Sequence, residues 1–410
     1  MKRKLPGIGK RGMVLIALIV VMRAPFGTTS TSEKWQPEIR SSESLTDLLT
    51  GISELYDQPA VAAALVYGDS IMAEATIGNI VYGEEKTVNE KSRFHIGSTT
   101  KSMTAVLVAM LVSEGRLSYD MTLQQVLQDI PMRDEYRKAT IHDLLCNKAG
   151  IIAFQITTFE DPDIVEKLTT EIPKAYPDPT DQRREVTKLA LSLEPIAEPG
   201  TKVIYSNIGW PIIGYIIELA TEQSYEKLLQ ERIFKPLGMN TARIGGWPAS
   251  PSDPDQPRGH YINPENKAEP TPQGLDDEYV LSPWMNPSGG VHCSIHDYAI
   301  YAREHLAGLQ GKGKLLSQSE YETIHTIHVR TNIRDMYPHM KDDREAMFGY
   351  GWGIAEKEYG NLSLGAGSGG TFFAQIYVYP ALNFAFVGFT NCGNGAPALR
   401  DIYQKVTGLE

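Results

Sequence analysis

The most informative segment of the chain is Phe94-His-Ile-Gly-Ser-Thr-Thr-Lys-Ser-Met-Thr-Ala-Val-Leu-Val-Ala-Met-Leu-Val-Ser-Glu114. From Lys101 to Glu114, apolar residues recur at helical spacing and cover most of the circumference, which predicts a helix buried at the centre of the protein. Ser98 and Lys101 stand at its start with the spacing S-x-x-K. On a helix this spacing places the hydroxyl and the amine on one face, about one turn apart.

The S-x-x-K spacing alone is a weak signal, because on the order of one match is expected by chance in a chain of this length. Ser224 and Lys227 form such a match, and Ser224 is typical of the N-cap of an amphipathic surface helix. Ser98 differs because apolar residues follow it on every side. The alternative, in which Ser98 caps a helix and Lys101 is a surface cation with a buried stem, is weakened by that apolar context.

The predicted position of Lys101 suits a general base. Burial disfavours the ammonium form and lowers the pKa of the amine toward the range in which it accepts a proton from Ser98. The helix N-terminus also offers free backbone N–H groups to an oxyanion that forms on an acylated serine. Ser98 is therefore the candidate nucleophile and Lys101 its candidate base.

Composition sets the class of protein and of substrate. The 410 residues are 42% hydrophobic and 22% charged, as in an ordinary globular protein of one or two domains. The net charge is −11 and no Lys/Arg block occurs beyond the N-terminus, which argues against nucleic acid as a partner and favours a small-molecule or peptide substrate. Cys146, Cys293 and Cys392 are odd in number and far apart, which predicts buried free thiols.

The first residues resemble a secretory signal. Residues 1–12 carry cations and no acid, and residues 13–22 are an unbroken apolar run that is too short to span a bilayer comfortably. No clear cleavage site follows. We therefore expect residues 1–30 to be a signal peptide or an uncleaved N-terminal anchor. The protein is expected to be exported to the periplasm or the extracellular space, with membrane attachment through residues 13–22 only if the segment stays uncleaved.

Strand patterns occur at both ends of the chain and helical patterns between them. Residues 61–67 and 70–75 predict a hairpin around Gly68 and Asp69. Further strands are predicted at residues 350–355, 372–379 and 384–390, and a closing helix at 396–407. This pattern predicts an α/β domain over 45–410, with an α/β part at about 45–115 and 288–410, a helical part at about 116–287, and one sheet built from both ends. The Pro/Asp-rich residues 248–272 are expected to form a surface loop.

Tyr205-Ser-Asn207 is a second candidate motif. Its Tyr-x-Asn spacing recurs twice elsewhere, so its context carries the signal: Pro199-Gly-Thr-Lys-Val-Ile precedes it, and a long helix and Pro236-Leu-Gly238 follow. Together with the segments at 94–101, 144–150 and 288–290, it makes the chain resemble the family of class C β-lactamases, low-molecular-mass DD-peptidases and carboxylesterases of the same fold. The resemblance covers nearly all of the chain after the N-terminal segment.

The resemblance implies a β-lactamase/transpeptidase-like fold, in which an antiparallel sheet formed by both chain ends is flanked by helices and the middle region is mostly helical. It implies that Tyr205 shares proton transfer with Lys101, first as base and then as acid to the leaving group. It implies that Asn207 orients Lys101 and the substrate. No metal and no cofactor is expected.

The third motif of that family, a Lys- or His-x-Gly strand beside the nucleophile, is changed here. Gly367 stands where the cation is expected, and Ser368 and Gly369 fill the other two places. We expect Gly370, taken as the next residue on the strand, to supply the second oxyanion N–H beside that of Ser98, with Ser368 and Gly369 lining the substrate. The missing cation favours an esterase or amidase over a β-lactamase or DD-peptidase. Arg330 or Arg334 remains a possible cation from elsewhere.

Competing chemistries are less well supported. Residues 366–370 nearly match the G-x-S-x-G elbow, but that fold needs a histidine after the serine, and the last histidine is His339. The pairs at 292/296 and 325/328 have helical spacing but lack the partners of a metal site. The leading hypothesis is a serine hydrolase that acts through an acyl-enzyme on an ester, amide or peptide. The alternatives are a non-catalytic binding protein of the same fold, or a DD-peptidase or β-lactamase with a cation from elsewhere.

Overall fold

The computed structural model describes residues 35–154, 161–263, 267–270, 281–337 and 340–409. The expected signal peptide or anchor at residues 1–30, with its apolar run at 13–22, lies outside these residues. Within them, no helix is both long and apolar enough to cross a membrane.

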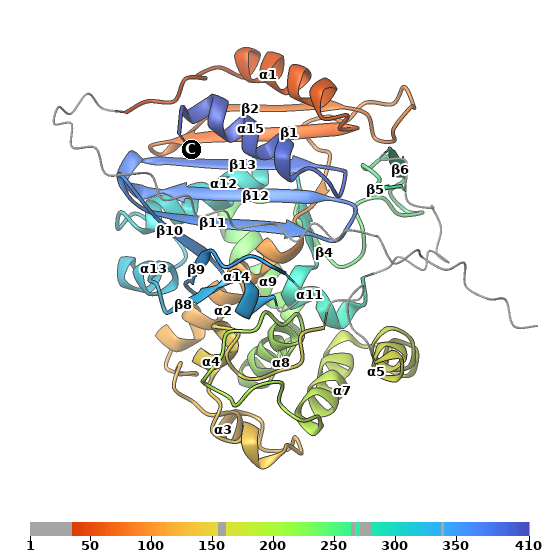
Figure 1. Ribbon diagram of the computed structural model, residues 1–410, viewed down its shortest axis with the longest axis vertical. Helices are drawn as coiled ribbons and strands as arrows, with labels where there is room; N and C mark the ends of the chain where they lie inside the picture. The colour runs from red at the N-terminus through yellow and green to blue at the C-terminus, as the bar shows by residue number, and fades with distance from the viewer. Residues whose placement is uncertain (1–34, 155–160, 264–266, 271–280, 338–339, 410) are drawn as a thin grey trace, which may run out of the picture.

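One antiparallel sheet contains strands from both ends of the chain (Figure 1). Its order is β2-β1-β13-β12-β11-β10-β9-β8, and Val61 of β1 lies opposite Thr390 of β13. The predicted fold class and the predicted hairpin of β1 and β2 are thus confirmed. The strands are β1 (Ala60–Tyr67), β2 (Ser70–Gly78), β8 (Val329–Asn332), β9 (Glu345–Phe348), β10 (Gly353–Lys357), β11 (Gly360–Ser368), β12 (Phe373–Tyr379) and β13 (Phe384–Thr390).

Helices cover both faces of this sheet, and further helices gather below it in the view of Figure 1. The longer ones are α1 (Ser42–Leu55), α2 (Thr100–Ser113), α7 (Pro179–Ser192), α8 (Gly209–Thr221), α12 (Ile295–Gly308) and α15 (Ala396–Thr407). The shorter ones are α3 (Leu123–Val126), α4 (Ile141–Leu145), α5 (Pro162–Glu166), α6 (Ile172–Ala175), α9 (Tyr225–Leu229), α10 (Lys235–Leu237), α11 (Asn286–Gly289), α13 (Gln318–His325) and α14 (Ile333–Met336).

The alternation of side chains along β1 separates two apolar cores. Val61 and Leu65 point to the face that packs against α1 and α15. Ala62 and Ala64 point to the opposite face, where the larger core contains α2, α8 and α12. Every residue of α2 from Thr100 to Leu111 is buried, as the apolar pattern predicts for a central helix.

Two local expectations need correction. Strand β10 begins at Gly353 rather than at Tyr350, because Gly351 adopts a φ of +76° in a turn that packs on α2. A Cβ on Gly351 would lie 2.8 Å from the carbonyl oxygen of Lys101, so only glycine fits there.

The stretch 248–272 is not simply a surface loop. Its described part contains the short strands β5 (His260–Ile262) and β6 (Ala268–Pro270), and His260 is fully buried. The His260 N–H donates to the carbonyl oxygens of Thr371 and Asn391, at 3.0 and 2.9 Å, which ties this segment to the turn after β11. One buried histidine among prolines and acids leaves no periodic pattern, so this anchor could not be predicted from the sequence.

A second, small sheet leads into the central helix. It consists of β3 (Phe94–His95), β7 (Val291–Cys293) and β4 (Arg243–Ile244), with β7 in the middle. His95 and His292 lie opposite each other in it and are buried. Burial lowers the pKa of His95 to about 4 and that of His292 to about 3.

A second pair of buried histidines lies behind the large sheet. His305 Nδ1 and His325 Nε2 are 2.8 Å apart, and His325 Nδ1 lies 2.7 Å from the hydroxyl of Ser363. Burial lowers the pKa of His325 to about 3 and that of His305 well below its ordinary value. Both pairs are therefore neutral in the folded protein.

Neutral buried histidines make the fold sensitive to acid. They bind protons in the unfolded chain near pH 6.5 but not in the folded protein, so stability is present above that pH and is lost as the pH falls below it. Each such group adds a slope of about 1.4 kcal/mol per pH unit, which corresponds to one proton.

We expect His325→Asn to lower the slope of the unfolding free energy against pH, between pH 6 and 4.5, by the contribution of one proton. The slope is measured by chemical denaturation at a series of pH values. His296→Asn, at an exposed histidine, serves as control, and equal slopes in all three proteins would contradict the assignment.

Candidate active site

The backbone around Ser98 is held by its contact with β11. Gly97 has a φ of +51° and opens a 3₁₀ turn, Gly97–Thr99, that continues directly into α2. A Cβ on Gly97 would lie 2.5 Å from the backbone nitrogen of Ser368. Only glycine allows the strand and the turn to approach this closely, and the approach sets Ser98 at the mouth of the buried helix.

The Lys101 amine lies among three neutral acceptors. Nζ is 3.0 Å from Ser98 Oγ, 3.0 Å from Asn207 Oδ1 and 2.7 Å from the carbonyl oxygen of Ser288. The residue is 4% exposed, and burial lowers the pKa of the amine well below its ordinary value. The arrangement favours a neutral amine beside the Ser98 hydroxyl.

Tyr205 approaches the same hydroxyl from the segment before α8. Its OH donates to Ser98 Oγ at 2.8 Å, and its ring centroid lies 5.0 Å from Lys101 Nζ. Burial raises the pKa of Tyr205 to about 12, so the phenol is protonated at neutral pH. The ring of Tyr337 packs against it at 5.3 Å between centroids, and the Tyr205 N–H donates to the carbonyl oxygen of Met336.

Asn207 and its neighbour Ser206 fix the start of α8. The Asn207 amide nitrogen donates to the carbonyl oxygen of Phe154 at 3.0 Å, which leaves Oδ1 facing Lys101. The Ser206 hydroxyl donates to the carbonyl oxygen of Ile152 and accepts the N–H of Gly209. The structure thus brings together Ser98, Lys101, Tyr205 and Asn207, the four residues proposed from the sequence.

The glycine-rich segment after them is arranged differently from the expectation. Strand β11 ends at Ser368, so Gly370 lies in the following turn, with a φ of +90°, and not on the strand. Its N–H donates to the Ser368 hydroxyl at 2.9 Å, and that hydroxyl donates to the carbonyl oxygen of Phe372. The oxyanion role of Gly370 stays a prediction. A Cβ on Gly369 would lie 2.6 Å from the indole of Trp247, which covers this turn.

Gly367 leaves no room for a cation. A Cβ there would lie 2.7 Å from the backbone nitrogen of Ser98 and closer still to the carbonyl oxygen of Ile96. The two alternative cations are engaged elsewhere. Arg330 pairs with Glu356 at 2.6 Å and Arg334 with Asp343 at 3.1 Å, all on the exposed surface.

Other sequence candidates have structural roles. Ser224 caps α9, and its hydroxyl accepts the N–H of Lys227 at 3.3 Å. Cys146, Cys293 and Cys392 are buried and free. In the part of the chain that the structure describes, no three His, Cys, Asp or Glu side chains are grouped to hold a metal ion.

Comparison with known proteins gives the family. The model of the family described as Beta-lactamase matches residues 45–407. The chain belongs to the beta-lactamase family. Among relatives, Penicillin-binding protein 4 of Amycolatopsis lactamdurans is 24% identical over 85% of this chain and 84% of its own length. Unguisins hydrolase ungD' of Aspergillus campestris is 23% identical over 73% of this chain and about half, 52%, of its own length.

Solved structures agree on the fold of this beta-lactamase family member. The chain shares 19% sequence identity with SurE, and its fold matches the crystal structure of SurE with a TM-score of 0.69. The match covers 90% of this chain and 77% of that chain. The penicillin-binding protein from Bacillus halodurans is 20% identical, with a TM-score of 0.66 over 87% and 99%. At these identities the likeness concerns the fold alone.

Several groups at the site were not found from the sequence. The carbonyl oxygens of Ser288 and Phe154 contact Lys101 and Asn207, but backbone atoms leave no residue-type signal. Tyr337 and Trp247 reach the site from segments with no motif of their own. The one indication of Trp247 in the sequence is the glycine run that it covers, because small residues leave space for a large neighbouring side chain.

The close contact at Gly367 gives a testable consequence. We expect Gly367→Ala to destabilise the protein by about 1–3 kcal/mol through overpacking and to slow reactions at Ser98, because the added methyl displaces the turn that carries the nucleophile. Gly51→Ala is the matched control, since a Cβ on this helical glycine meets nothing within 4 Å. Thermal unfolding and covalent labelling of Ser98 measure both effects. If Gly367→Ala matches Gly51→Ala in stability and labelling rate, the steric account is wrong.

Proposed function

We propose that this beta-lactamase family member is a serine hydrolase that forms an acyl-enzyme at Ser98 with ester or amide substrates. The observation that carries the proposal is the position of the Ser98 hydroxyl, which lies 3.0 Å from the Lys101 amine and 2.8 Å from the Tyr205 phenol. Lys101 is buried and Tyr205 is half-buried, and their pKa values are shifted in opposite directions. Such a pair divides the work of base and acid.

The pKa shifts assign the resting proton positions. Lys101, with its lowered pKa, is the group that accepts the proton of Ser98 Oγ as that oxygen attacks the carbonyl carbon of the substrate. Tyr205, with its pKa raised to about 12, starts protonated and gives its proton to the leaving oxygen or nitrogen. The proton held by Lys101 then returns to Tyr205, which leaves the acyl-enzyme and a neutral amine.

Deacylation reverses the same transfers. A water molecule attacks the acyl carbon, the Lys101–Tyr205 pair takes its proton, and the proton passes to Ser98 Oγ as the acid product leaves. We propose the N–H groups of Ser98 and Gly370 as oxyanion donors in both steps. For Gly370 this requires that its N–H leaves the Ser368 hydroxyl, its partner in the unliganded site.

The charges around the site favour substrates without a carboxylate beside the scissile bond. Gly367 admits no side chain, and Arg330 and Arg334 are paired with surface carboxylates. The aromatic rings of Tyr337 and Trp247 lie close to the catalytic residues and the glycine turn instead. We therefore propose an esterase or amidase. The relative named as a penicillin-binding protein favours a second candidate, a DD-peptidase or β-lactamase.

We also propose export of the protein. The support is the basic and apolar character of residues 1–22 in the sequence. A reporter fusion that loses export when residues 13–22 are deleted agrees with it.

Replacement of the nucleophile tests the activity directly. We expect the protein to hydrolyse p-nitrophenyl butyrate and to gain one fluorophosphonate adduct at Ser98, seen by intact mass, and Ser98→Ala to lose the adduct and lower kcat by more than about 1000-fold. Ser224→Ala is the matched control, because it removes the serine of the other S-x-x-K match and costs only a helix cap. Absence of an adduct on the unmodified protein contradicts the proposal and favours a non-catalytic binding protein. Faster hydrolysis of nitrocefin or a D-alanyl peptide than of the ester favours the second candidate.

The role of Tyr205 as acid predicts a dependence on the leaving group. We expect Tyr205→Phe to slow hydrolysis of an alkyl amide by about 100-fold or more, because a poor leaving group must be protonated as it departs. A p-nitrophenyl ester of the same acid is expected to lose less than about 10-fold, since p-nitrophenolate leaves unprotonated. Equal losses for the two substrates would show that Tyr205 acts only as a base or a structural group.

A further inference from the structure

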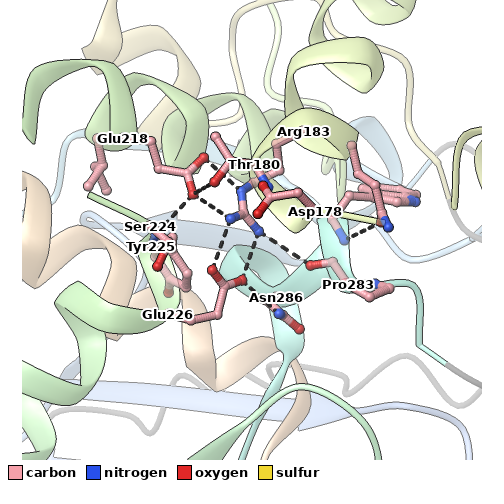
Figure 2. A network of polar contacts seen from close by, with 12 residues as sticks. Asp178, Thr180, Arg183, Glu218, Ser224, Tyr225, Glu226, Pro283 and Asn286 are labelled. Carbon is pink, nitrogen blue, oxygen red and sulfur yellow. Dashed lines mark hydrogen bonds and ion pairs between the residues drawn. The ribbon is translucent and has the colours of Figure 1, made fainter. Parts of the chain in front are cut away.

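A buried ion cluster joins three helices of the middle region (Figure 2). The fully buried guanidinium of Arg183 on α7 binds two carboxylates, one from α8 and one from α9. Its Nε lies 3.0 Å from Glu218 Oε2, and a second guanidinium nitrogen contacts Glu218 Oε1. The other carboxylate, Glu226, accepts at 2.9 and 3.0 Å. The cluster ties three helices together with one positive and two negative groups.

The cluster reaches the active site through Asn286. The Asn286 amide nitrogen donates to Glu226 Oε1 at 2.8 Å, as Figure 2 shows. Asn286 begins α11, and two residues later the carbonyl oxygen of Ser288 accepts the Lys101 amine at 2.7 Å. Between them, the carbonyl oxygen of Pro287 accepts the hydroxyl of Thr104, one turn along α2 from Lys101. Residues 286–288 are thus fixed at one end by the ion cluster and bind the general base at the other.

The Ser288 carbonyl decides where the lone pair of the base points. A neutral amine has two hydrogens, and two acceptors other than Ser98 contact Lys101 Nζ: Asn207 Oδ1 and the Ser288 carbonyl oxygen. With both hydrogens bound there, the lone pair faces Ser98 Oγ at 3.0 Å. A displaced Ser288 carbonyl frees one hydrogen to turn toward Ser98 and the lone pair to turn away.

We propose that the Arg183–Glu218–Glu226 cluster, acting through Asn286, is the positioning device that holds the Ser288 carbonyl against the Lys101 amine and so directs the base toward the nucleophile. This inference rests on the proposed serine hydrolase function. Arg183, Glu226 and Asn286 touch no reacting atom, so they are positioning residues. The Asn286 side chain is a link that can be cut while the ion pairs stay intact, and the longer contact of Arg183 with the carbonyl oxygen of Pro283, at 3.4 Å, is then kept.

The test cuts that link. We expect Asn286→Ala to lower kcat for p-nitrophenyl butyrate and the rate of fluorophosphonate labelling by about 10- to 100-fold, with KM changed less than about twofold, because the base is misaligned and the substrate contacts are kept. The acid limb of the pH profile of kcat/KM, which reports Lys101, is expected to move to lower pH as the ammonium loses an acceptor. Tyr205, the titratable group in contact with Lys101, is protonated across that limb.

A matched control separates positioning from general loss of stability. Thr221→Val removes a hydroxyl that contacts the carbonyl oxygens of Ile217, at 2.7 Å, and Gln223, at 3.4 Å, in the same helical region but outside the cluster. It is expected to lower the unfolding temperature while kcat and the pH profile stay at wild-type values. If the ratio of lost activity to lost stability is the same for Thr221→Val and Asn286→Ala, the activity of Asn286→Ala falls only because stability is lost, and the positioning role is wrong.

A reversed hydrogen bond tests the link without an empty site. Asn286→Asp alone places a carboxylate 2.8 Å from that of Glu226 and is expected to lose activity. Adding Glu226→Gln lets the new amide nitrogen donate to the carboxylate introduced at position 286 and keeps the cluster at two carboxylates, although the same atom then no longer accepts from Arg183. The double variant is therefore expected to regain part of the kcat that Asn286→Asp loses. No gain over Asn286→Asp contradicts the proposal even if Asn286→Ala fails to fold.

The outcomes distinguish this inference from the function on which it rests. If the unmodified protein gains no adduct at Ser98, the serine hydrolase function is wrong and the positioning role falls with it. If the unmodified protein is labelled and folded Asn286→Ala is labelled at the same rate, the function stands and the positioning role is wrong.

Discussion

The structure depends on the burial of one amine without a charged partner. Lys101 sits on a helix whose residues from Thr100 to Leu111 are all buried, and its amine meets a hydroxyl, an amide oxygen and a backbone carbonyl. Transfer of an ammonium ion from water into such a place is strongly unfavourable unless a carboxylate compensates it. Burial therefore favours the neutral amine, and this is the physical ground on which we propose Lys101 as the base beside Ser98.

Close backbone contact is the second constraint, and it links geometry to selectivity. Gly97 and Gly367 let β11 approach the turn that carries Ser98, which sets the nucleophile beside the end of the strand. The same contact removes the space in which a cationic side chain would project from β11. One steric fact thus underlies both the placement of Ser98 and the preference that we propose for substrates without a neighbouring carboxylate.

Local patterns explain what the sequence could predict. Some features depend only on residues that are close in the sequence, and the structure places these as expected. They are the apolar helix at 101–114, the hairpin around Gly68 and the S-x-x-K and Tyr-x-Asn motifs. The expectation that Gly370 lies on the strand is wrong because a run of glycines does not mark where β11 ends. The carbonyl of Ser288 carries no residue-type signal, and Arg183, Glu218 and Glu226 look like ordinary surface charges of amphipathic helices until tertiary packing buries them together.

The Lys101 amine has to be kept apart from the charges of the ion cluster, and Asn286 provides this separation. A carboxylate in contact with the Lys101 amine would favour the ammonium form and cancel the effect of burial. The ion cluster contains two carboxylates for one guanidinium, so direct contact with it would do this. Asn286 is uncharged, and the backbone from Asn286 to Ser288 transmits the position of Glu226 while keeping its charge away from the amine. A strongly paired, rigid cluster can therefore support a base that has to remain uncharged.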